Sequence, residues 1–549
     1  GPEVRAVFDA IKAARGVPDV NNFWKKRMKK IKKITRNLCK STLVKFVTCF
    51  IKFFKNPFMK KLITLIVMIS FVLASCGGTS STDKETLNVE IPLKTKSIAP
   101  YETDIPVKTG ALESLFKMSK NGKVKPLLVK KYHQVSDNQL ELTLKDNIKF
   151  QNGHHLTGEA VKRSLEEGMK KSDLLKGSLP IKSINAHGQK VTINTKEPYP
   201  ELKSELASPF AAIYDTKAKN KVTDQPVGTG PYQIDSYKRS QKIVLKQFKD
   251  YWQGTPKLKR INVTYHEDGN TRVDHLLSGK SDLTTDVPIE RVDDVKKSNK
   301  ANIQSTSGFR THLMLYNHDS KKVNKKVREA LDMIINRKDI AKNVSKNYAD
   351  SASGPFNHRL KSLEKEEIQS QDIKRAKELL AKEGYSKSHP LKLNMVTYDG
   401  RPELPKIGQV IQSEAKKANV DIQLRNVDDI EGYLQNKQAW DVSMYSYLSV
   451  PRGDTGYFFN TAYLPEGALN KGNYSNPKVT QLIKKLNTTF GDKQRAQVTN
   501  EILNESKKDV PNSYITYNSQ IDGVNNNVRH FNVTPESIYL IDYKLSKKE

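Results

Sequence analysis

The sequence predicts an α/β protein, and three observations support this fold class. Segments that alternate apolar and polar residues, as β-strands do, recur from residue 86 onward. Beyond residue 310 they are interleaved with segments whose apolar residues recur at helical spacing. Residues 76–549 are long enough for at least two domains and contain no repeat, coiled coil or low-complexity tract. Strands that alternate with helices indicate layered α/β packing.

The part of the chain before residue 310 is predicted to be rich in strands. Alternating residues predict strands over 86–92, 139–150, 190–200, 242–248 and 260–266, and 227–237 is predicted to be a Gly-rich turn that leads into another strand. Thr157 is a suitable N-cap, and 159–171 is predicted to form the helix that follows it. Gly228 and Gly230, just before a proline, predict a tight turn in which an added side chain would collide.

After residue 310 strands and helices alternate. Strands are predicted over 312–317, 391–398, 420–427 and 440–448. Helices are predicted over 326–336, 372–385 and 407–418, where apolar residues recur at helical spacing. This pattern is typical of a second α/β domain.

Residues 59–75 are predicted to be a secretory signal that is removed. Two lysines precede twelve residues, 62–73, without charge or proline, and small residues then lead to Cys76. A membrane helix needs roughly 20 apolar residues, and most core helices are amphipathic, which this run is not. Leu73-Ala74-Ser75-Cys76 resembles the lipobox of bacterial lipoproteins, which implies cleavage before Cys76 and a lipid on its thiol. A core helix that ends in cysteine is the alternative.

The segments that flank the signal have distinct compositions. Residues 1–58 are strongly basic and could form an amphipathic helix at a membrane surface. We expect instead that the natural protein starts at Met59, so that 1–58 is not part of the mature chain. Residues 76–86 are small and polar and predict a flexible tether. Residues 77–549 contain no cysteine, so an exported fold would be held by core packing alone.

The chain is basic, with 93 Lys+Arg against 60 Asp+Glu and a formal net charge of +33. The lysines are scattered rather than gathered in one patch. Together with an export signal, this favours solubility and attraction to an anionic cell envelope over nucleic-acid binding. We expect a monomer with no nucleic-acid partner.

Five motifs occur in the order and spacing of a known family. They are "LTLKDNIKFQNGHHLTGEAVKRSL", "GTGPY", "KDYWQGTPKLKRINV", "VREALDMIINRKDI" and "DIKRAKELLAKEGY". Together they resemble the family 5 bacterial extracellular solute-binding proteins, the peptide/nickel type that serves ABC importers. The resemblance covers about 87–549. It implies a protein outside the cell, lipid-anchored to the outer face of the cytoplasmic membrane, with an ABC permease and an ATPase as partners.

The family resemblance also implies a domain organisation. It implies a two-lobe periplasmic-binding-protein-like fold of class II type, with crossover strands, a hinge and an interlobe cleft. Lobe I is expected at 87–310 together with 516–549, and lobe II at 311–515.

The sequence does not predict an enzyme. It contains no HExxH, GxSxG, P-loop or CxxC motif, and no paired carboxylates on a glycine-rich frame. No resident cofactor is expected. A membrane-tethered hydrolase is the alternative from another functional class, and turnover of a chromogenic ester, peptide or phosphate would reveal it.

The segment 440–459 is the most informative about the ligand. In the resembled family this strand and loop line the cleft, and dipeptide-type members place an Asp shortly before a Gly-Asp pair. Here the pair is Gly453-Asp454, but Pro451 and Arg452 stand where that Asp would be. A cation at this position suits a ligand that presents carboxylates rather than a free amine.

Four further side chains complete the predicted ligand site. Tyr445 and Tyr447 alternate onto one face of the same strand, where tyrosines suit the apolar rings of a ligand. Arg310, at the expected crossover, and Arg401, in the loop "YDGRPE", are the other arginines expected near the cleft. Each arginine could equally be a solvated surface residue.

The histidines argue against a bare metal ion as the ligand. His154 and His155 are adjacent but occupy a turn that in the family faces away from the cleft, so they are only weak metal candidates. The sequence has no dense cluster of His, Cys and carboxylates that would cage a transition metal. Compared with known nickel-binding members, 205–210 lacks an Arg and the loop after Asp454 lacks a His. Nickel is therefore expected through an exogenous chelator.

The predicted function follows from this ligand site. The sequence resembles most the nickel-binding lipoproteins of Gram-positive bacteria. We expect it to capture nickel, or cobalt, as a chelate with a small molecule such as histidine, whose nitrogens Ni²⁺ prefers. Capture of oligopeptides or dipeptides for an ABC importer is the alternative.

Overall fold

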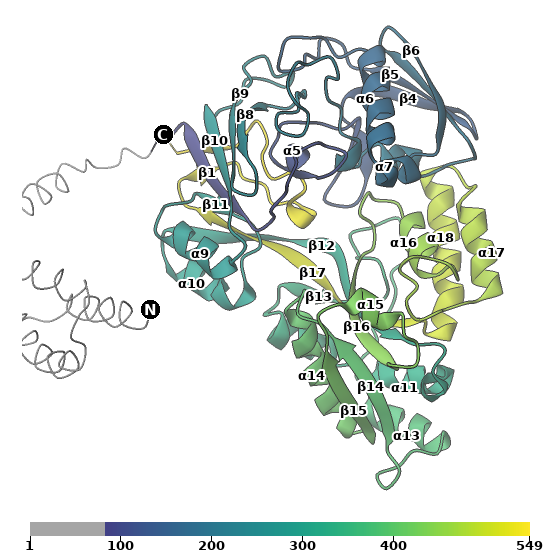
Figure 1. Ribbon diagram of the computed structural model, residues 1–549. Helices are drawn as coiled ribbons and strands as arrows, with labels where there is room; N and C mark the ends of the chain where they lie inside the picture. The colour runs from purple at the N-terminus through teal and green to yellow at the C-terminus, as the bar shows by residue number, and fades with distance from the viewer. Residues whose placement is uncertain (1–82, 549) are drawn as a thin grey trace, which may run out of the picture. The chain divides into compact units, whose positions relative to one another are not determined.

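A long mixed sheet runs through residues 83–548, the part of the chain that this computed structural model describes (Figure 1). Its strand order is β15-β14-β16-β12-β17-β11-β1-β10-β9-β8, with β13 paired to β17. The strands are β1 (Thr86–Ile91), β8 (Tyr232–Lys238), β9 (Lys242–Gln247), β10 (Arg260–Tyr265), β11 (Leu283–Thr284), β12 (Ala301–Tyr316), β13 (Ala349–Ser351), β14 (Leu391–Thr397), β15 (Val420–Asn426), β16 (Val442–Leu448) and β17 (Asn512–Asn525).

Strands β12 and β17 connect the two lobes. They pair antiparallel from Ala301 opposite Asn525 to Leu315 opposite Asn512. One end of this ribbon meets β11 and the other meets β16. The register shifts between residues 307 and 310, and again between 312 and 313. Such irregularities bend and twist a strand pair, so the ribbon changes direction where it passes from one lobe to the other.

Lobe I carries the amino-terminal elements. A separate four-stranded antiparallel sheet has the order β4-β5-β7-β6. It consists of β4 (Val129–Ser136), β5 (Gln139–Leu144), β6 (Ile181–His187) and β7 (Lys190–Thr195). The helices are α5 (Ile105–Lys108), α6 (Gly158–Lys171), α7 (Asp173–Ser178), α8 (Leu202–Glu205), α9 (Gly269–Leu277) and α10 (Val292–Lys297). Helix α6 begins where the sequence predicts, because the Thr157 hydroxyl accepts a hydrogen bond from Ala160 N at 3.2 Å.

Short elements complete lobe I. Strands β2 (Phe116–Met118) and β3 (Val124–Pro126) form one hairpin, and β18 (Val528–Arg529) pairs with β19 (Ser546–Lys547). The carboxy-terminal segment that follows β17 returns to lobe I, where Leu540, Ile541 and Leu545 belong to the buried cluster.

The helices of lobe II are α11 (Lys325–Ile334), α12 (Arg337–Asp339), α13 (Ile373–Lys382), α14 (Glu403–Lys416), α15 (Ile430–Leu434), α16 (Gly456–Ala462), α17 (Pro477–Leu486) and α18 (Asp492–Ser506). Helix α14 packs on β14, β15 and β16, whereas α16, α17 and α18 pack on one another apart from these strands (Figure 1). Strands β14 and β15 are parallel, and α14 makes the crossover between them. The predicted α/β fold with two lobes is confirmed.

Each lobe has its own apolar core. In lobe I, Leu87, Val89 and Ile261 belong to one buried cluster. In lobe II, Trp440 and Phe458 belong to another. Separate cores are what two bodies that move about a hinge require. The exact limits at 310/311 and 515/516 stay predictions.

The family motifs of lobe I converge on one buried carboxylate. Glu113 accepts hydrogen bonds from Thr229 Oγ1 at 2.9 Å, Tyr251 Oη at 2.7 Å and Trp252 Nε1 at 2.9 Å. Burial raises the pKa of Glu113, and these three donors offset part of that rise. The "GTGPY" and "KDYWQG" motifs thus hold this part of lobe I together.

The "GTGPY" turn needs its glycines for space. A Cβ at Gly228 would lie 2.5 Å from the carbonyl oxygen of Ala111, and one at Gly230 would lie 2.2 Å from that of Gly110. Both distances are shorter than real contacts, so the predicted collision is confirmed.

The predicted export and anchoring elements lie outside the described residues. These are the basic segment 1–58, the signal 59–75 and Cys76. Within residues 83–548, no helix is both long and apolar enough to cross a membrane.

Candidate functional site

Arg310 lies on β12 where the ribbon passes between the lobes. Its Nη1 donates a hydrogen bond to Ser446 Oγ at 3.2 Å, and its Nε lies 3.5 Å from Glu536 Oε1. The Nε is buried and has no hydrogen-bond partner among residues 83–548. Burial lowers the pKa of Arg310, Glu536 offsets part of this, and the positive charge of Arg401 lowers it further. The charges of the two predicted arginines therefore act on each other.

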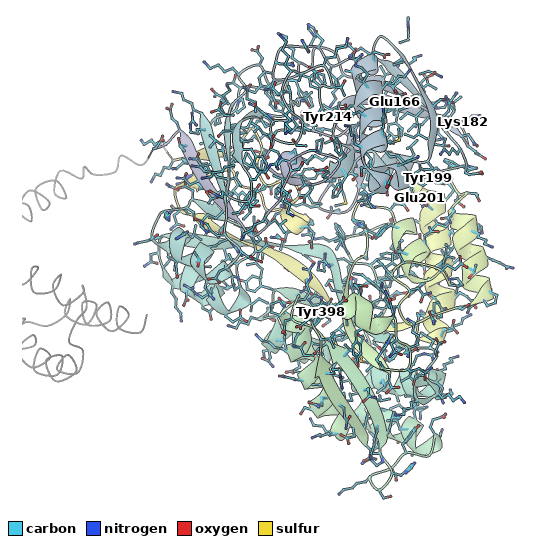
Figure 2. All side chains as sticks on the ribbon, viewed as in Figure 1. Glu166, Lys182, Tyr199, Glu201, Tyr214 and Tyr398 are labelled. Atoms are coloured by element: carbon cyan, nitrogen blue, oxygen red, sulfur yellow. The ribbon has the colours of Figure 1, made fainter. Side chains whose placement is uncertain are left out.

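Arg401 follows β14 in the loop that leads into α14. It is half-buried, and its charge acts on Arg310 and on Tyr398. Figure 2 labels Tyr398 near the crossover ribbon. Its ring centroid lies 6.2 Å from that of Tyr445, a separation typical of aromatic pairs. The sequence analysis missed Tyr398, although it stands in the same "YDGRPE" segment as Arg401.

Tyr445 and Tyr447 lie side by side on β16, as the alternation predicts. Their ring centroids are 5.2 Å apart at an interplanar angle of 69°. The Tyr445 hydroxyl donates to Glu431 Oε1, and the Tyr447 hydroxyl donates to the backbone carbonyl of Leu469. Both side chains are buried, at 4% and 2% exposed. Their rings are thus fixed by hydrogen bonds at the far end of each side chain.

His312 is a buried histidine that the sequence analysis did not single out. Its Nδ1 is 3.0 Å from Ser446 Oγ, and its Nε2 is 2.8 Å from Asn518 Nδ2 and 3.6 Å from Glu403 Oε2. Burial lowers the pKa of His312, and Glu403 offsets part of that effect. Both ring nitrogens have protein partners, so the imidazole positions its neighbours and is not poised to ligate a metal.

Arg452 lies in the loop after β16 and reaches the other lobe. Its Nε is 2.9 Å from Glu205 Oε2 of α8, and its guanidinium lies 5.2 Å from the ring centroid of Tyr457. Burial raises the pKa of Glu205, and the charge of Arg452 offsets part of that rise. The arginine that sequence reasoning assigned to the ligand therefore also forms an ion pair between the lobes.

A second ion-pair group links the lobes beside Arg452. Arg495 of α18 donates to both oxygens of Asp454, at 3.0 and 2.6 Å, and lies 3.4 Å from Glu201 Oε1. Burial raises the pKa of Glu201 to about 7, and Asp454 adds to this while Arg495 opposes it. Figure 2 labels Glu201 and Tyr199 where lobe I meets the α17 and α18 helices. No spacing in the sequence could reveal this group, because Arg495 and Glu201 are 294 residues apart.

The weak metal candidates His154 and His155 lie on the surface of lobe I. His154 Nδ1 is 2.6 Å from Asp215 Oδ2, and 57% of the His154 side chain is exposed. His155 is exposed too. Within residues 83–548, neither histidine forms a hydrogen bond or ion pair with any of the predicted cleft residues.

A cavity of about 390 Å³ lies in lobe II, away from the predicted ligand residues. It is lined by side chains that include Arg337, Glu366, Tyr463 and Tyr514. Its lining includes none of Arg310, Arg401, Tyr445, Tyr447 and Arg452. Ion pairs from Arg452 to Glu205 and from Arg495 to Glu201 join the two lobes.

The family of the protein is shown by its sequence profile. Residues 123–470 match the bacterial extracellular solute-binding proteins, family 5 (middle region). The chain is a family 5 bacterial extracellular solute-binding protein. Proteins of this family are extracellular and bind solutes, which agrees with the two lobes and the export signal expected from the sequence.

Relatives of known structure support the same assignment. The nickel-binding protein NikA of Staphylococcus aureus is 57% identical over 485 residues, which are 88% of this chain and 98% of NikA. The crystal structure of that NikA in complex with Ni(L-His)2 matches with a TM-score of 0.71 and 58% identity over 84% of this chain and 100% of NikA. A nickel ABC transporter structure from Bacillus halodurans matches with a TM-score of 0.78 and 30% identity, over 84% and 100% of the two chains.

Proposed function

We propose that this family 5 protein captures nickel as a chelate with histidine between its lobes and delivers it to an ABC permease and ATPase. The observation that carries the proposal is the cationic cluster at the crossover. Arg310 and Arg401 lie near each other, and Arg310 has a buried Nε without a hydrogen-bond partner in the described chain. Two neighbouring guanidinium groups favour a ligand that brings carboxylates, and arginine pairs with these in bidentate geometry.

Direct coordination of a bare ion is disfavoured at this cluster. Its imidazole, His312, already has partners at both nitrogens. Two arginines beside it would also repel a divalent cation. A chelate of Ni²⁺ with histidine removes both obstacles, because histidine supplies imidazole and amine donors and turns its carboxylate outward.

Aromatic side chains complete the complement to such a chelate. Tyr398 and Tyr445 pack against each other near the two arginines. Flat aromatic faces suit the imidazole rings of bound histidine. The identity to S. aureus NikA, whose crystal structure holds Ni(L-His)2, supports the same class of ligand. Like its binding-protein relatives, the chain is proposed to act without catalysis.

The proposal includes a lipid anchor at Cys76 on the outer face of the cytoplasmic membrane. One acyl chain holds a protein to a membrane only marginally, so a diacyl anchor is expected on this thiol. With Cys76→Ala, the protein should appear in the medium. Full retention of that variant in the membrane fraction would contradict the anchor.

Calorimetry tests the ligand with four titrations of the protein. The ligands are Ni²⁺ alone, L-histidine alone, both together, and a pool of mixed peptides. We expect nickel with histidine to bind much more tightly than Ni²⁺ alone, histidine alone or the peptides. Tight binding of peptides, with no gain from nickel plus histidine, would establish oligopeptide capture instead and overturn the proposal.

A further inference from the structure

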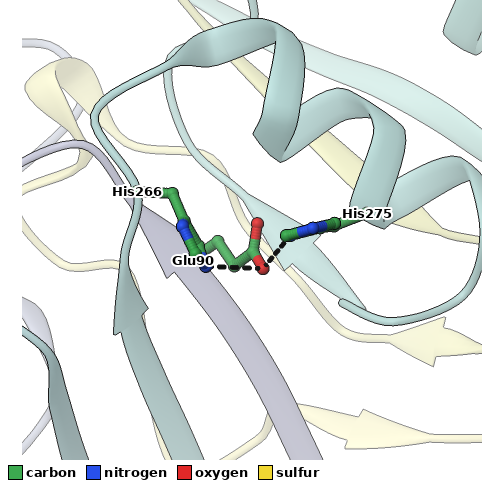
Figure 3. A group of neighbouring side chains, drawn as sticks. All are labelled: Glu90, His266 and His275. Atoms are coloured by element: carbon green, nitrogen blue, oxygen red, sulfur yellow. Dashed lines mark hydrogen bonds and ion pairs between the residues drawn. The ribbon is translucent and has the colours of Figure 1, made fainter. Parts of the chain in front are cut away.

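Three potential metal-ligating side chains meet in lobe I, on elements that carry none of the predicted cleft residues. Glu90 lies on β1, His266 directly follows β10, and His275 lies on α9. Figure 3 shows the three side chains pointing toward one another from these separate elements. Glu90 Oε1 is 2.6 Å from His275 Nδ1 and 3.5 Å from His266 Nε2. One donor atom from each residue lies within 4.8 Å of the other two.

Glu90 is a buried carboxylate, and within the described chain only one of its two oxygens has partners. The residue is 4% exposed, and its Oε2 has no hydrogen-bond partner in the part of the chain that is described. A buried carboxylate is costly unless cations or hydrogen-bond donors surround it. The two imidazoles approach only Oε1. The second oxygen therefore marks a position where a cation would stabilise the site.

The backbone around the three residues is held firmly. β1 lies between β10 and β11 and is parallel to both, so Glu90 occupies the middle of the sheet. Helix α9 begins at the N-cap Asp268, whose side chain accepts from the backbone N–H groups of residues 270 and 271. Donors that must meet within a few tenths of an ångström benefit from such a rigid frame.

Arg272 of α9 is hydrogen-bonded to backbone carbonyls rather than to Glu90. Its guanidinium donates to the backbone carbonyls of His266, Glu267, Thr285 and Asp286 at 2.8 to 3.3 Å. These bonds fix the loop that presents His266. The Glu90 carboxylate is left with the imidazoles of His266 and His275 as its partners.

We propose that Glu90, His266 and His275 form a binding site for a late first-row divalent transition metal of the Zn²⁺ type. Two imidazoles and one carboxylate are a ligand set that zinc takes, with water at the open position. A tetrahedral ion with bonds of about 2.1 Å holds its donor atoms roughly 3.4 Å apart. The 3.5 Å separation between His266 and Glu90 already matches this, and the shorter separation to His275 opens when the ion replaces the bridging proton.

The donor set also selects against the common alkaline-earth ions. Ca²⁺ takes six to eight oxygen ligands, and Mg²⁺ requires octahedral oxygen geometry. Imidazole suits Zn²⁺, Cu²⁺ and Ni²⁺. Bare Ni²⁺ would thus bind the protein here, apart from any chelate in the cleft.

The test is a titration of tag-free protein with Zn²⁺ in the absence of histidine, followed by calorimetry and native mass spectrometry. We expect one zinc ion per molecule in the wild type. His266→Gln and His275→Gln should each weaken zinc binding at least tenfold, because each removes a direct ligand. His187→Gln, an exposed histidine at the end of β6, is the matched control and should bind zinc like the wild type.

Further measurements distinguish the loss of a metal ligand from the loss of the fold. Metal-free thermal unfolding shows whether each variant folds. In the wild type, Co²⁺ should give the strong visible absorption of a four-coordinate ion, and zinc should raise the melting temperature. Zinc binding that is absent in the wild type, or equal in the folded His266→Gln, His275→Gln and His187→Gln variants, would overturn the proposal.

Discussion

Arg310 at the crossover and Glu90 in lobe I are both mostly buried charges with one polar atom that lacks a hydrogen-bond partner among residues 83–548, but their signs are opposite. Arg310 has a second arginine nearby, whereas Glu90 has two imidazoles. A cationic cluster favours a ligand that brings its own anionic groups, and a carboxylate with imidazoles favours a bare cation. From this difference we expect two modes of metal binding in one chain, through a chelate at Arg310 and through side chains at Glu90.

The largest effect that separates the two regions is expected from Arg310→Ala. Loss of one partner of a buried charged pair typically costs about 2–5 kcal/mol, so the affinity for nickel with histidine should fall about thirtyfold or more. Zinc binding without histidine should not change. Calorimetry with both ligands measures this, and Arg375→Ala, an exposed arginine on α13, is the control. Equal chelate affinity in Arg310→Ala and Arg375→Ala would remove Arg310 from the site.

Arg452→Ala should weaken the binding of the nickel–histidine chelate by at least roughly tenfold. The variant removes a cation of the predicted ligand site and leaves the buried Glu205 without its partner across the lobes. The affinity for bare Ni²⁺ should not change in this variant. Glu205→Gln separates the loss of the cation from the loss of the ion pair. It keeps Arg452 but breaks the ion pair, so we expect a smaller loss of chelate affinity in this variant. An unchanged affinity in Arg452→Ala would show that this arginine serves neither the ligand nor closure.

Glu201 predicts a pH dependence of stability. Its pKa of about 7 in the folded protein lies above the ordinary carboxyl value of 4.5, so the folded state holds the proton more tightly than the unfolded state. The contribution of Glu201 to the free energy of unfolding therefore falls as pH rises from about 4.5 to 7.

Glu201→Gln should abolish this fall, because the amide does not titrate. Denaturant unfolding between pH 5 and 8 measures it, and the stability of the variant relative to the wild type should rise over that range. Glu267→Gln, at a side chain that is 81% exposed, is the control. A constant difference between Glu201→Gln and wild type across the range would contradict the raised pKa.

The smallest effect is expected from Tyr447→Phe. The change removes the hydrogen bond to the backbone carbonyl of Leu469, which is worth about 1 kcal/mol of unfolding free energy. The ring stays in place, so we expect less than a threefold change in chelate affinity. A loss above tenfold would mean that the hydroxyl itself binds the ligand.

Much of the fold follows from local sequence patterns. The predicted strands and helices of lobe II lie within a few residues of β14, β15, β16, α11, α13 and α14. The crossover was harder to predict. The sequence indicated a strand over 312–317, whereas β12 runs from Ala301 to Tyr316, because its first half is polar and is held by pairing with β17. Pairing between segments so far apart in the chain leaves no local signal.

The sites were less predictable than the fold. Arg401 and Tyr445 could be proposed because the family resemblance places their segments at the cleft. Glu90 and His275 are 185 residues apart, so no spacing rule for metal ligands joins them. Only the parallel pairing of β1 with β10, and the return of α9 over that sheet, bring the donors together.

The central claim is that the cleft takes nickel together with its chelator. Native mass spectrometry tests it most directly on His275→Gln protein, in which the Glu90 cluster has lost a ligand, after incubation with Ni²⁺ and L-histidine. We expect a complex whose added mass contains both nickel and histidine, and which is absent when either component is left out. Nickel retained without histidine, or a bound peptide in its place, would contradict the account.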